Sequence, residues 1–328
     1  MSENSIFKIR KLKKSFGKRQ VLKDINLEVR QGEILGLIGQ SGSGKTTLLH
    51  TMIGFLKPDQ GVVEALIEPP HRALGGPTYK DLYKNMNAVK QLYGFASQMP
   101  SFYNNLTVRE NLEYFGSLYD LPKKTLQTNA EILLHLMDLE PAEKMLAKNL
   151  SGGMERRLDI ACALMHDPAV LILDEPTADL DPILRNHIYD LIKKINNKNT
   201  TIVLASHHLS DIEHVCDRIA ILNEGSIIAV GSPDQIKDKY SSTLTIHLKT
   251  NKQSYDDMAS ELRHHHLFSE VNVVGSELHL HTTSADDAVK EILDTVARHH
   301  QKIDVLLISK PSLDEIFIRL LGEQGDQE

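Results

Sequence analysis

A glycine-rich octapeptide carries the clearest chemistry in this chain. Residues Gly39 to Thr46 read G-x-x-x-x-G-K-T between an apolar run and a helix-like stretch, a context that separates this motif from a chance glycine-rich turn. Backbone N–H groups can turn inward here around phosphate oxygens, and the helix start adds positive partial charge. Lys45 supplies a cation for the β- and γ-phosphates, and Thr46 a hydroxyl ligand for Mg²⁺. The predicted nucleotide-binding residues are Gly39, Gln40, Ser41, Gly42, Ser43, Gly44, Lys45, Thr46 and Thr47.

Two adjacent carboxylates follow a second apolar run. The segment Val170-Leu-Ile-Leu-Asp174 ends in Asp174, and Glu175 comes next. A carboxylate at the end of a buried strand can hold Mg²⁺, and a second one can orient or deprotonate an attacking water. Such a pair alone would usually be a strand end that meets solvent. After a phosphate loop it predicts ATP hydrolysis, with Asp174 as a metal ligand and Glu175 as a catalytic residue beside Lys45.

A third motif resembles a known family. Ser151-Gly152-Gly153-Met154 stands just before Leu171-Ile-Leu-Asp-Glu-Pro-Thr177, and the ordered motifs of about residues 6–235 resemble the ATP-binding-cassette (ABC) proteins. The resemblance implies that Ser151, Gly152 and Gly153 hold the γ-phosphate bound by another protomer, so that a homodimer shares its sites. A serine donor, two glycines that allow close approach and a helix dipole fit that role. The same serine can also begin the helix as its N-cap.

More residues take roles from the resemblance by position. Gln98 resembles the glutamine that contacts Mg²⁺ and senses the membrane partner, and it is a predicted catalytic residue. Asp181 resembles an acid that lies across the dimer. His207 resembles the switch histidine that contacts the γ-phosphate, with His208 as the alternative. Phe16 resembles the aromatic residue that stacks on adenine, although a core phenylalanine at a strand end is the competing interpretation.

Two positions depart from the family pattern. Met154 replaces the commonest glutamine of the signature, and Asp179 replaces a usually small residue. An extra carboxylate near the dimer seam could weaken closure. Because all the hydrolysis residues are present, we still expect an active ATPase that uses ATP and Mg²⁺.

These motifs require a particular fold to position them. Residues 33–38, 170–173 and 201–205 are apolar on both faces, as buried parallel strands are, and helix-like stretches lie between them. We therefore expect an α/β fold. The resemblance makes it a P-loop NTPase nucleotide-binding domain with a RecA-like core, an antiparallel β subdomain and a helical signature subdomain. Residues 68–90, which contain Pro69-Pro70 and Gly75-Gly76-Pro77, are predicted to be a surface insertion.

The character of the chain changes after Pro233. Strand-like and helix-like stretches between residues 243 and 309 alternate as β-α-β-β-α-β, the order of a ferredoxin-like α+β unit. The predicted organisation is an ABC ATP-binding domain over residues 1–235 and a small accessory domain over residues 240–328.

Composition bounds the class of protein. The chain has 328 residues, of which 41% are hydrophobic and 25% charged, and these values are typical of soluble globular proteins. Its net charge of −7 argues against nucleic-acid binding. No apolar stretch is long enough to span a bilayer, and the N-terminus lacks a signal-peptide core. Cys162 and Cys216 lie in apolar, helix-like stretches and are expected to be buried thiols in a reducing compartment, with no structural disulfide.

The C-terminal residues favour one branch of the family. The segment Pro311-Ser312-Leu-Asp-Glu-Ile-Phe317 resembles the tail of ATPase subunits in ABC-2 type exporters. The resemblance implies a separate transmembrane permease, which would hold this chain at the cytoplasmic face of the cell membrane. Exposed aromatics between Gln98 and Ser151 are the expected contact region.

Other functions compete with that interpretation. One alternative is a soluble ABC-type ATPase acting on chromosomes or ribosomes, and another is an importer ATPase with a regulatory C-terminal domain. No long coiled coil and no second cassette are visible, and the terminal motif argues against an importer. The histidines at 264–266 and 299–300 invite a metal site, but solvated helix faces are the favoured interpretation because consecutive helical residues point to different sides.

Overall fold

The computed structural model describes residues 5–67, 78–207, 209–240, 243–252 and 254–318. The prolines and glycines predicted to mark an insertion at 69–77, and the alternative switch residue His208, lie outside the described residues. The chain divides into two compact units, Met1–Ser232 and Pro233–Glu328.

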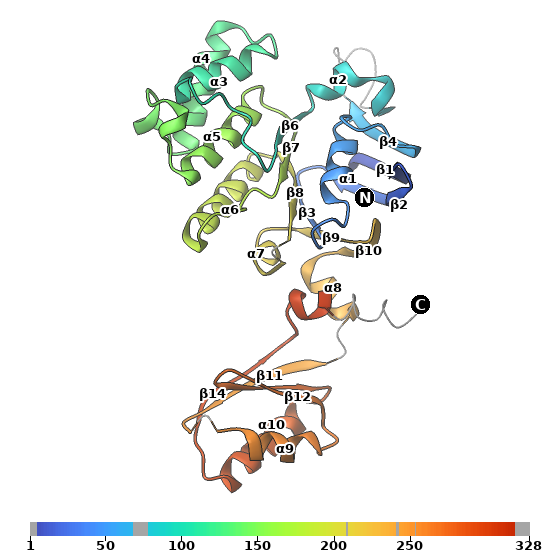
Figure 1. The fold of residues 1–328 in the computed structure, drawn as a ribbon, viewed down its shortest axis with the longest axis vertical. Coiled ribbons are helices and arrows are strands. Elements are labelled where there is room, and N and C mark those ends of the chain that lie inside the picture. Colours follow the sequence, from blue (N-terminus) through green and yellow to red (C-terminus); the bar gives the residue numbers. More distant parts are fainter. Residues whose placement is uncertain (1–4, 68–77, 208, 241–242, 253, 319–328) are drawn as a thin grey trace. The chain divides into compact units, whose positions relative to one another are not determined.

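A six-stranded sheet forms the centre of the first unit (Figure 1). Its strands are β3 (Ile34–Ile38), β6 (Tyr93–Ala96), β7 (Val170–Asp174), β8 (Thr201–Ser206), β9 (Arg218–Asn223) and β10 (Ser226–Gly231). They follow the order β10-β9-β3-β8-β7-β6, and all neighbours are parallel except the edge pair β10 and β9. Every residue of β3, β7 and β8 is buried, as expected for a parallel sheet with both faces covered.

An antiparallel sheet forms a second layer of this unit. Its strands are β1 (Ser5–Phe16), β2 (Arg19–Arg30), β4 (Gln60–Ile67) and β5 (Thr78–Asp81), in the order β2-β1-β4-β5. The expected surface insertion is therefore wrong over its second half. Residues 78–81 pair with β4, and the short helices η2 (Leu82–Lys84) and α2 (Met86–Lys90) bury Leu82 and Val89 in the core. The proline and glycine pairs predict a loop, whereas the apolar residues Leu82 and Val89 that follow them anchor this segment in the core.

Helices complete the first unit. They are α1 (Lys45–Met52), α3 (Val108–Ser117), α4 (Lys123–Leu136), α5 (Gly152–Leu164), α6 (Pro182–Asn196) and α7 (Leu209–Glu213), with 3₁₀ turns η3 (Glu140–Ala142) and η4 (Ala147–Asn149). A capping box of Thr107 and Glu110 starts α3, and Pro122 stands at the N-cap of α4. Figure 1 shows α3, α4 and α5 grouped as a helical layer. Among the described helices, none is long and apolar enough to cross a membrane.

Both cysteines lie in this unit as buried free thiols, and burial raises the pKa of each. Cys162 belongs to α5, whereas Cys216 follows α7 in a turn rather than lying in a helix.

The second unit is an α+β domain. Its elements are α8 (Pro233–Tyr240), β11 (Leu244–Thr250), α9 (Asp256–Arg263), β12 (Phe268–Val274), β13 (Glu277–Thr282), α10 (Ala285–Arg298) and β14 (Ile303–Ser309). The strands form an antiparallel sheet in the order β12-β13-β11-β14, and α9 and α10 cover one of its faces (Figure 1). This order confirms the predicted ferredoxin-like fold. Residues 313–318 add a helical segment near the C-terminus.

Candidate active site

Three adjacent strands of the parallel sheet end at the same edge. The register pairs Ile38 of β3 with Ser206 of β8, and Asp174 of β7 with Ala205 of β8. The next residues along the three strands are Gly39, Glu175 and His207. Sequence positions far apart in the chain therefore meet where open α/β sheets bind ligands, outside the carboxyl ends of their strands.

The glycine-rich loop wraps tightly between β3 and α1. A Cβ atom on Gly39 would lie 2.3 Å from the backbone oxygen of Leu222, so only glycine fits at the loop entrance. Gly44 adopts a φ of 111° immediately before α1, a conformation that side chains rarely allow. Lys45 begins the helix and donates from Nζ to the backbone oxygens of Gly39, at 2.8 Å, and Gln40, at 3.3 Å. The loop thus presents a helix start and a buried ammonium group to the same space.

Glu175 bridges two of the other predicted catalytic residues, Lys45 and His207. Its Oε1 lies 3.5 Å from Lys45 Nζ, and its Oε2 lies 2.9 Å from His207 Nδ1. The backbone of Glu175 has a φ of 49°, and its N–H donates to the Ala205 oxygen at 3.0 Å. This uncommon conformation orients the carboxylate toward the loop instead of along the strand. A cation, a carboxylate and an imidazole are therefore held in one connected group.

The residues expected to bind Mg²⁺ also lie together. Asp174 is 3% exposed, and its Oδ1 has no hydrogen-bond partner among the described residues. The carboxylate of Asp174 also forms a hydrogen bond with the Thr46 side chain. Burial raises the pKa of Asp174, and the bond with Thr46 works against that increase. A hydroxyl beside an unsatisfied buried carboxylate is an oxygen-donor set that suits a hard divalent cation. Ser43 Oγ is likewise buried without a partner among the described residues.

The predicted adenine contact lies on the surface. Phe16, the last residue of β1, is 50% exposed, which excludes the alternative that it belongs to the core. It borders a hollow of about 270 Å³ whose other walls include Lys45, Thr46 and Thr47. Arg19 and Val21 line the same hollow and were not predicted. No motif marks them, because they enter the site from β2 through its pairing with β1.

The signature residues lie elsewhere in the first unit. Ser151 occupies the N-cap of α5, although its hydroxyl oxygen accepts no hydrogen bond from the backbone N–H groups of the first turn. A Cβ atom on Gly153 would lie 3.1 Å from a methyl group of Leu184 in α6, so this glycine allows close helix packing. In Figure 1, α5 stands among the helices on one side of the central strands and α1 on the other.

A buried arginine that sequence reasoning missed links these regions. Arg156 of α5 donates to the backbone oxygens of Pro176 at 2.8 Å, Ser97 at 2.6 Å and Asp174 at 3.2 Å. Its guanidinium group lies 3.4 Å from Asp159, and burial lowers its pKa. The signature helix is therefore tied to the chain segments that carry Gln98 and Glu175. An arginine and an aspartate three residues apart in an apolar helix were the available signal.

The remaining predicted residues take these positions. Gln98 follows β6 and is exposed. Asp181 caps α6, and its carboxylate accepts hydrogen bonds from the backbone N–H groups of Ile183 and Leu184 at 2.9 and 3.0 Å. Asp179 has a φ of 61°, within the tight turn between β7 and α6. The structure thus unites the loop, Asp174, Glu175 and His207, while the signature and Asp181 belong to neighbouring surfaces.

Comparison with known families gives two matches along the chain. Residues 22–178 match the model of the ABC transporter family. Residues 231–321 match the C-terminal domain of ATP-binding proteins like DrrA1-3.

Curated relatives align over nearly their whole length. The linearmycin resistance ATP-binding protein LnrL of Bacillus subtilis is 30% identical, with 95% of this chain and 96% of that protein aligned. The bacitracin transport ATP-binding protein BcrA of Bacillus licheniformis is 31% identical, over 97% and 98%. Among solved structures, cbiO1 of Clostridium perfringens, part of the transporter complex cbiONQ, aligns with a TM-score of 0.64 and 26% identity, covering 72% of this chain and 92% of that one.

Proposed function

The chain belongs to the ABC transporter family, as an ATP-binding subunit of the exporter type, and from that premise we propose that it hydrolyses ATP to drive export through a separate membrane subunit. The observation that carries the proposal is the connected group of Lys45, Glu175 and His207 beside the unsatisfied Asp174. A cation, a carboxylate, an imidazole and a potential metal ligand in one place support a site for phosphoryl transfer to water.

Each residue has a proposed task in hydrolysis. The loop N–H groups and Lys45 hold the β- and γ-phosphates, where they oppose the negative charge that shifts during transfer. Glu175 orients the attacking water and accepts its proton. His207 holds the Glu175 carboxylate in place and contacts the γ-phosphate. Thr46, Asp174 and Gln98 are the proposed residues for Mg²⁺, which supplies charge neutralisation at the phosphates when bound.

A second protomer completes the proposed site. Ser151 and Gly152 are exposed at the start of α5, whereas Gly153 is buried, and Figure 1 shows α5 and α1 on opposite sides of the central strands. In a two-fold dimer this helix start can therefore meet the partner's nucleotide. The Ser151 hydroxyl is not used for capping, which leaves it able to donate to a phosphate oxygen. Asp181 keeps its capping role and stands at the proposed seam. ATP would join the two halves, and its hydrolysis would release them.

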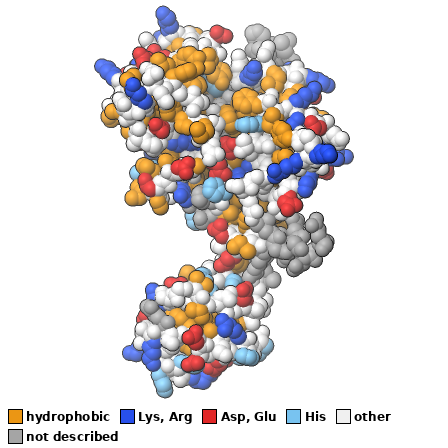
Figure 2. Space-filling view, viewed as in Figure 1, with side chains coloured by type: hydrophobic (Ala, Val, Ile, Leu, Met, Phe, Trp, Pro, Cys, Tyr) orange, Lys and Arg blue, Asp and Glu red, His pale blue; other side chains and the backbone are white. Residues whose placement is uncertain are grey.

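An apolar groove is the proposed contact for the membrane subunit. It measures about 770 Å³, and its lining includes Phe55, Phe95, Phe115 and Tyr119. Figure 2 shows hydrophobic side chains gathered over the region of α3 to α5. Ser97 and Ser101 also border the groove, and Gln98 lies between them. We propose that an amphipathic helix of the permease docks here at the cytoplasmic face of the membrane, in direct reach of the segment that carries Gln98.

The test is ATP turnover by the variant Lys45→Ala. Loss of the ammonium group should lower phosphate release by roughly 100-fold or more, the scale seen when one charge-stabilising donor is removed from an active site. Lys57→Ala is the matched control, because Lys57 is exposed and outside the site. Circular dichroism verifies that both variants are folded. Near-normal turnover in folded Lys45→Ala would overturn the proposal.

A further inference from the structure

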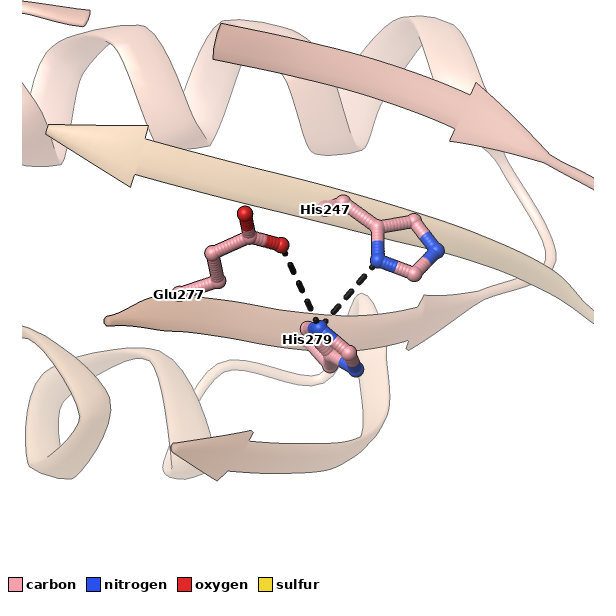
Figure 3. Close-up of side chains that lie close together, drawn as sticks. All are labelled: His247, Glu277 and His279. Atoms are coloured by element: carbon pink, nitrogen blue, oxygen red, sulfur yellow. Dashed lines mark hydrogen bonds and ion pairs between the residues drawn. The ribbon is translucent and has the colours of Figure 1, made fainter. Parts of the chain in front are cut away.

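Helices α9 and α10 cover only one face of the sheet of the second unit. Strand alternation sends Ile246 and Leu248 of β11 into the core beneath α9 and α10, so His247 lies on the opposite face. Leu278 and Leu280 of β13 point inward in the same way, and this places Glu277 and His279 outward. The register pairs His247 directly with His279. Figure 3 shows the three outward side chains turned toward one another from these two strands.

Their distances suit a shared cation. His247 Nδ1 lies 3.2 Å from His279 Nε2, and a carboxylate oxygen of Glu277 lies 3.7 Å from the same His279 nitrogen. The three ligand atoms, one from each residue, all lie within 4.8 Å of one another. Two nitrogens bound to one tetrahedral Zn²⁺ at its usual bond length are separated by about 3.3 Å. The histidine nitrogens are thus already spaced as the edge of such a site.

The surrounding charge also favours a cation. The carboxylates of Glu277 and Glu315 both act electrostatically on His247. Burial, followed by the neighbouring His279, lowers the pKa of His247. His279 is 22% exposed and Glu277 is 38% exposed, so an ion can enter from solvent.

The other histidines of this unit have different surroundings. Nδ1 of His264 lies 2.7 Å from the Ser260 oxygen, and Nε2 of His299 lies 2.8 Å from Glu261. His266 is exposed at the end of α9. Within the described part of the chain, the group of His247, Glu277 and His279 is the one whose ligand atoms converge.

We propose that the second unit binds a divalent transition-metal ion of the Zn²⁺ class, with His247 Nδ1, His279 Nε2 and the Glu277 carboxylate as ligands. Two imidazoles and one carboxylate select such ions over Mg²⁺ and Ca²⁺, which prefer oxygen. Three protein ligands leave a fourth tetrahedral position for water or an external group. The competing account is a simple hydrogen bond between two neutral imidazoles, which needs no metal.

The first experiment measures Zn²⁺ binding to the full chain by isothermal titration calorimetry. Any affinity tag is removed, nucleotide is omitted, and Mg²⁺ is kept in excess to occupy the phosphate-loop site. The wild type should bind one ion tightly. His279→Gln keeps a polar side chain and should lower the affinity for Zn²⁺ by roughly 100-fold or more. Loss of even a residue that only supports a metal ligand lowers metal affinity by about 10- to 100-fold. The double variant His264→Gln with His266→Gln is the matched control and should bind like the wild type.

A second readout reports on coordination. Co²⁺ bound to the wild type should give the intense visible absorption of a four-coordinate ion, and this band should disappear in His247→Gln. Zn²⁺ should also raise the melting temperature of the wild type and of the control, because an ion that binds the folded state stabilises it. Equal binding to the wild type and to folded His279→Gln would overturn the site. Absence of a tight binding event in the wild type would overturn it as well, in favour of the hydrogen-bonded pair.

Discussion

The central sheet of the first unit and the sheet of the second unit place polar side chains in different ways. In the central sheet β3, β7 and β8 are parallel and fully buried, so their reactive groups emerge where these strands end. In the second unit the sheet is antiparallel, with helices on one face, so its polar groups stand on the strands themselves. A site at strand ends is formed by the loops that follow the strands. A site on a sheet face is formed by side chains that the strand register makes neighbours.

This difference has energetic consequences. The first site contains buried ionic groups, including Lys45 and Asp174 at 7% and 3% exposure, that need partners from several segments. The histidine group of the second unit is partly exposed, and water can solvate it when no ion is bound. We therefore expect substitutions of buried polar groups in the first unit to cost stability, and substitutions of the second group to cost mainly ligand affinity.

The largest expected change in stability comes from Arg156→Met. Removal of the guanidinium group leaves Asp159 buried without its cation and frees three backbone oxygens, so the free energy of unfolding should fall by roughly 3–5 kcal/mol. Arg157→Met is the matched control in the same helix. It loses a 2.8 Å bond to the Met137 oxygen and should cost about 1 kcal/mol. Urea denaturation measures both, and equal costs would contradict the role assigned to Arg156.

Acid pH should lower the free energy of unfolding through His166, a partly buried residue whose ring stacks on that of Tyr119. Burial lowers the pKa of this histidine from 6.5 to about 4. Between those pH values the unfolded chain binds a proton and the folded chain does not, so the stability present above pH 6.5 is lost as the pH falls toward 4, by at most about 3 kcal/mol. Urea denaturation across this window compares the wild type with His166→Gln, whose profile should be flatter. Parallel profiles would show that His166 does not couple folding to pH.

The smallest expected effect follows removal of residues 241–328. Every predicted nucleotide contact lies in the first unit, Met1–Ser232, so ATP affinity should stay within about two-fold of the full chain. Fluorescence titration with a labelled ATP analogue measures this affinity. A truncated protein that is folded but does not bind the analogue would place part of the nucleotide site in the second unit.

The sequence predicted the fold class, the buried strands that carry the first site and the order of the strands and helices between residues 243 and 309. It did so because the first site depends on contiguous motifs: a loop such as Gly39 to Thr46 carries its own backbone geometry and its neighbouring strand. The β-α-β-β-α-β order of the second unit was also visible, because strand alternation is a local signal.

The features that sequence reasoning missed depend on tertiary pairing. His247 and His279 are 32 residues apart, and only the register of β11 with β13 makes them neighbours. The consecutive histidines at 264–266 are conspicuous in the sequence, but they follow the end of α9 at Arg263, and their ligand atoms form no converging group of three among the described residues. Arg156 was missed for a related reason, since its three carbonyl partners come from two other segments.

The shared site in a dimer is the central claim, and one pair of variants tests it most directly. Glu175→Gln keeps the size of the side chain but removes the carboxylate proposed to accept the proton of water, so this variant should bind Mg-ATP, fail to hydrolyse it and accumulate as a dimer. Adding Ser151→Arg places a bulky cation at the proposed seam. Size-exclusion chromatography with light scattering, with and without ATP, should show an ATP-dependent dimer for Glu175→Gln and a monomer for the double variant. Equal ATP-dependent dimers in both would contradict the composite site.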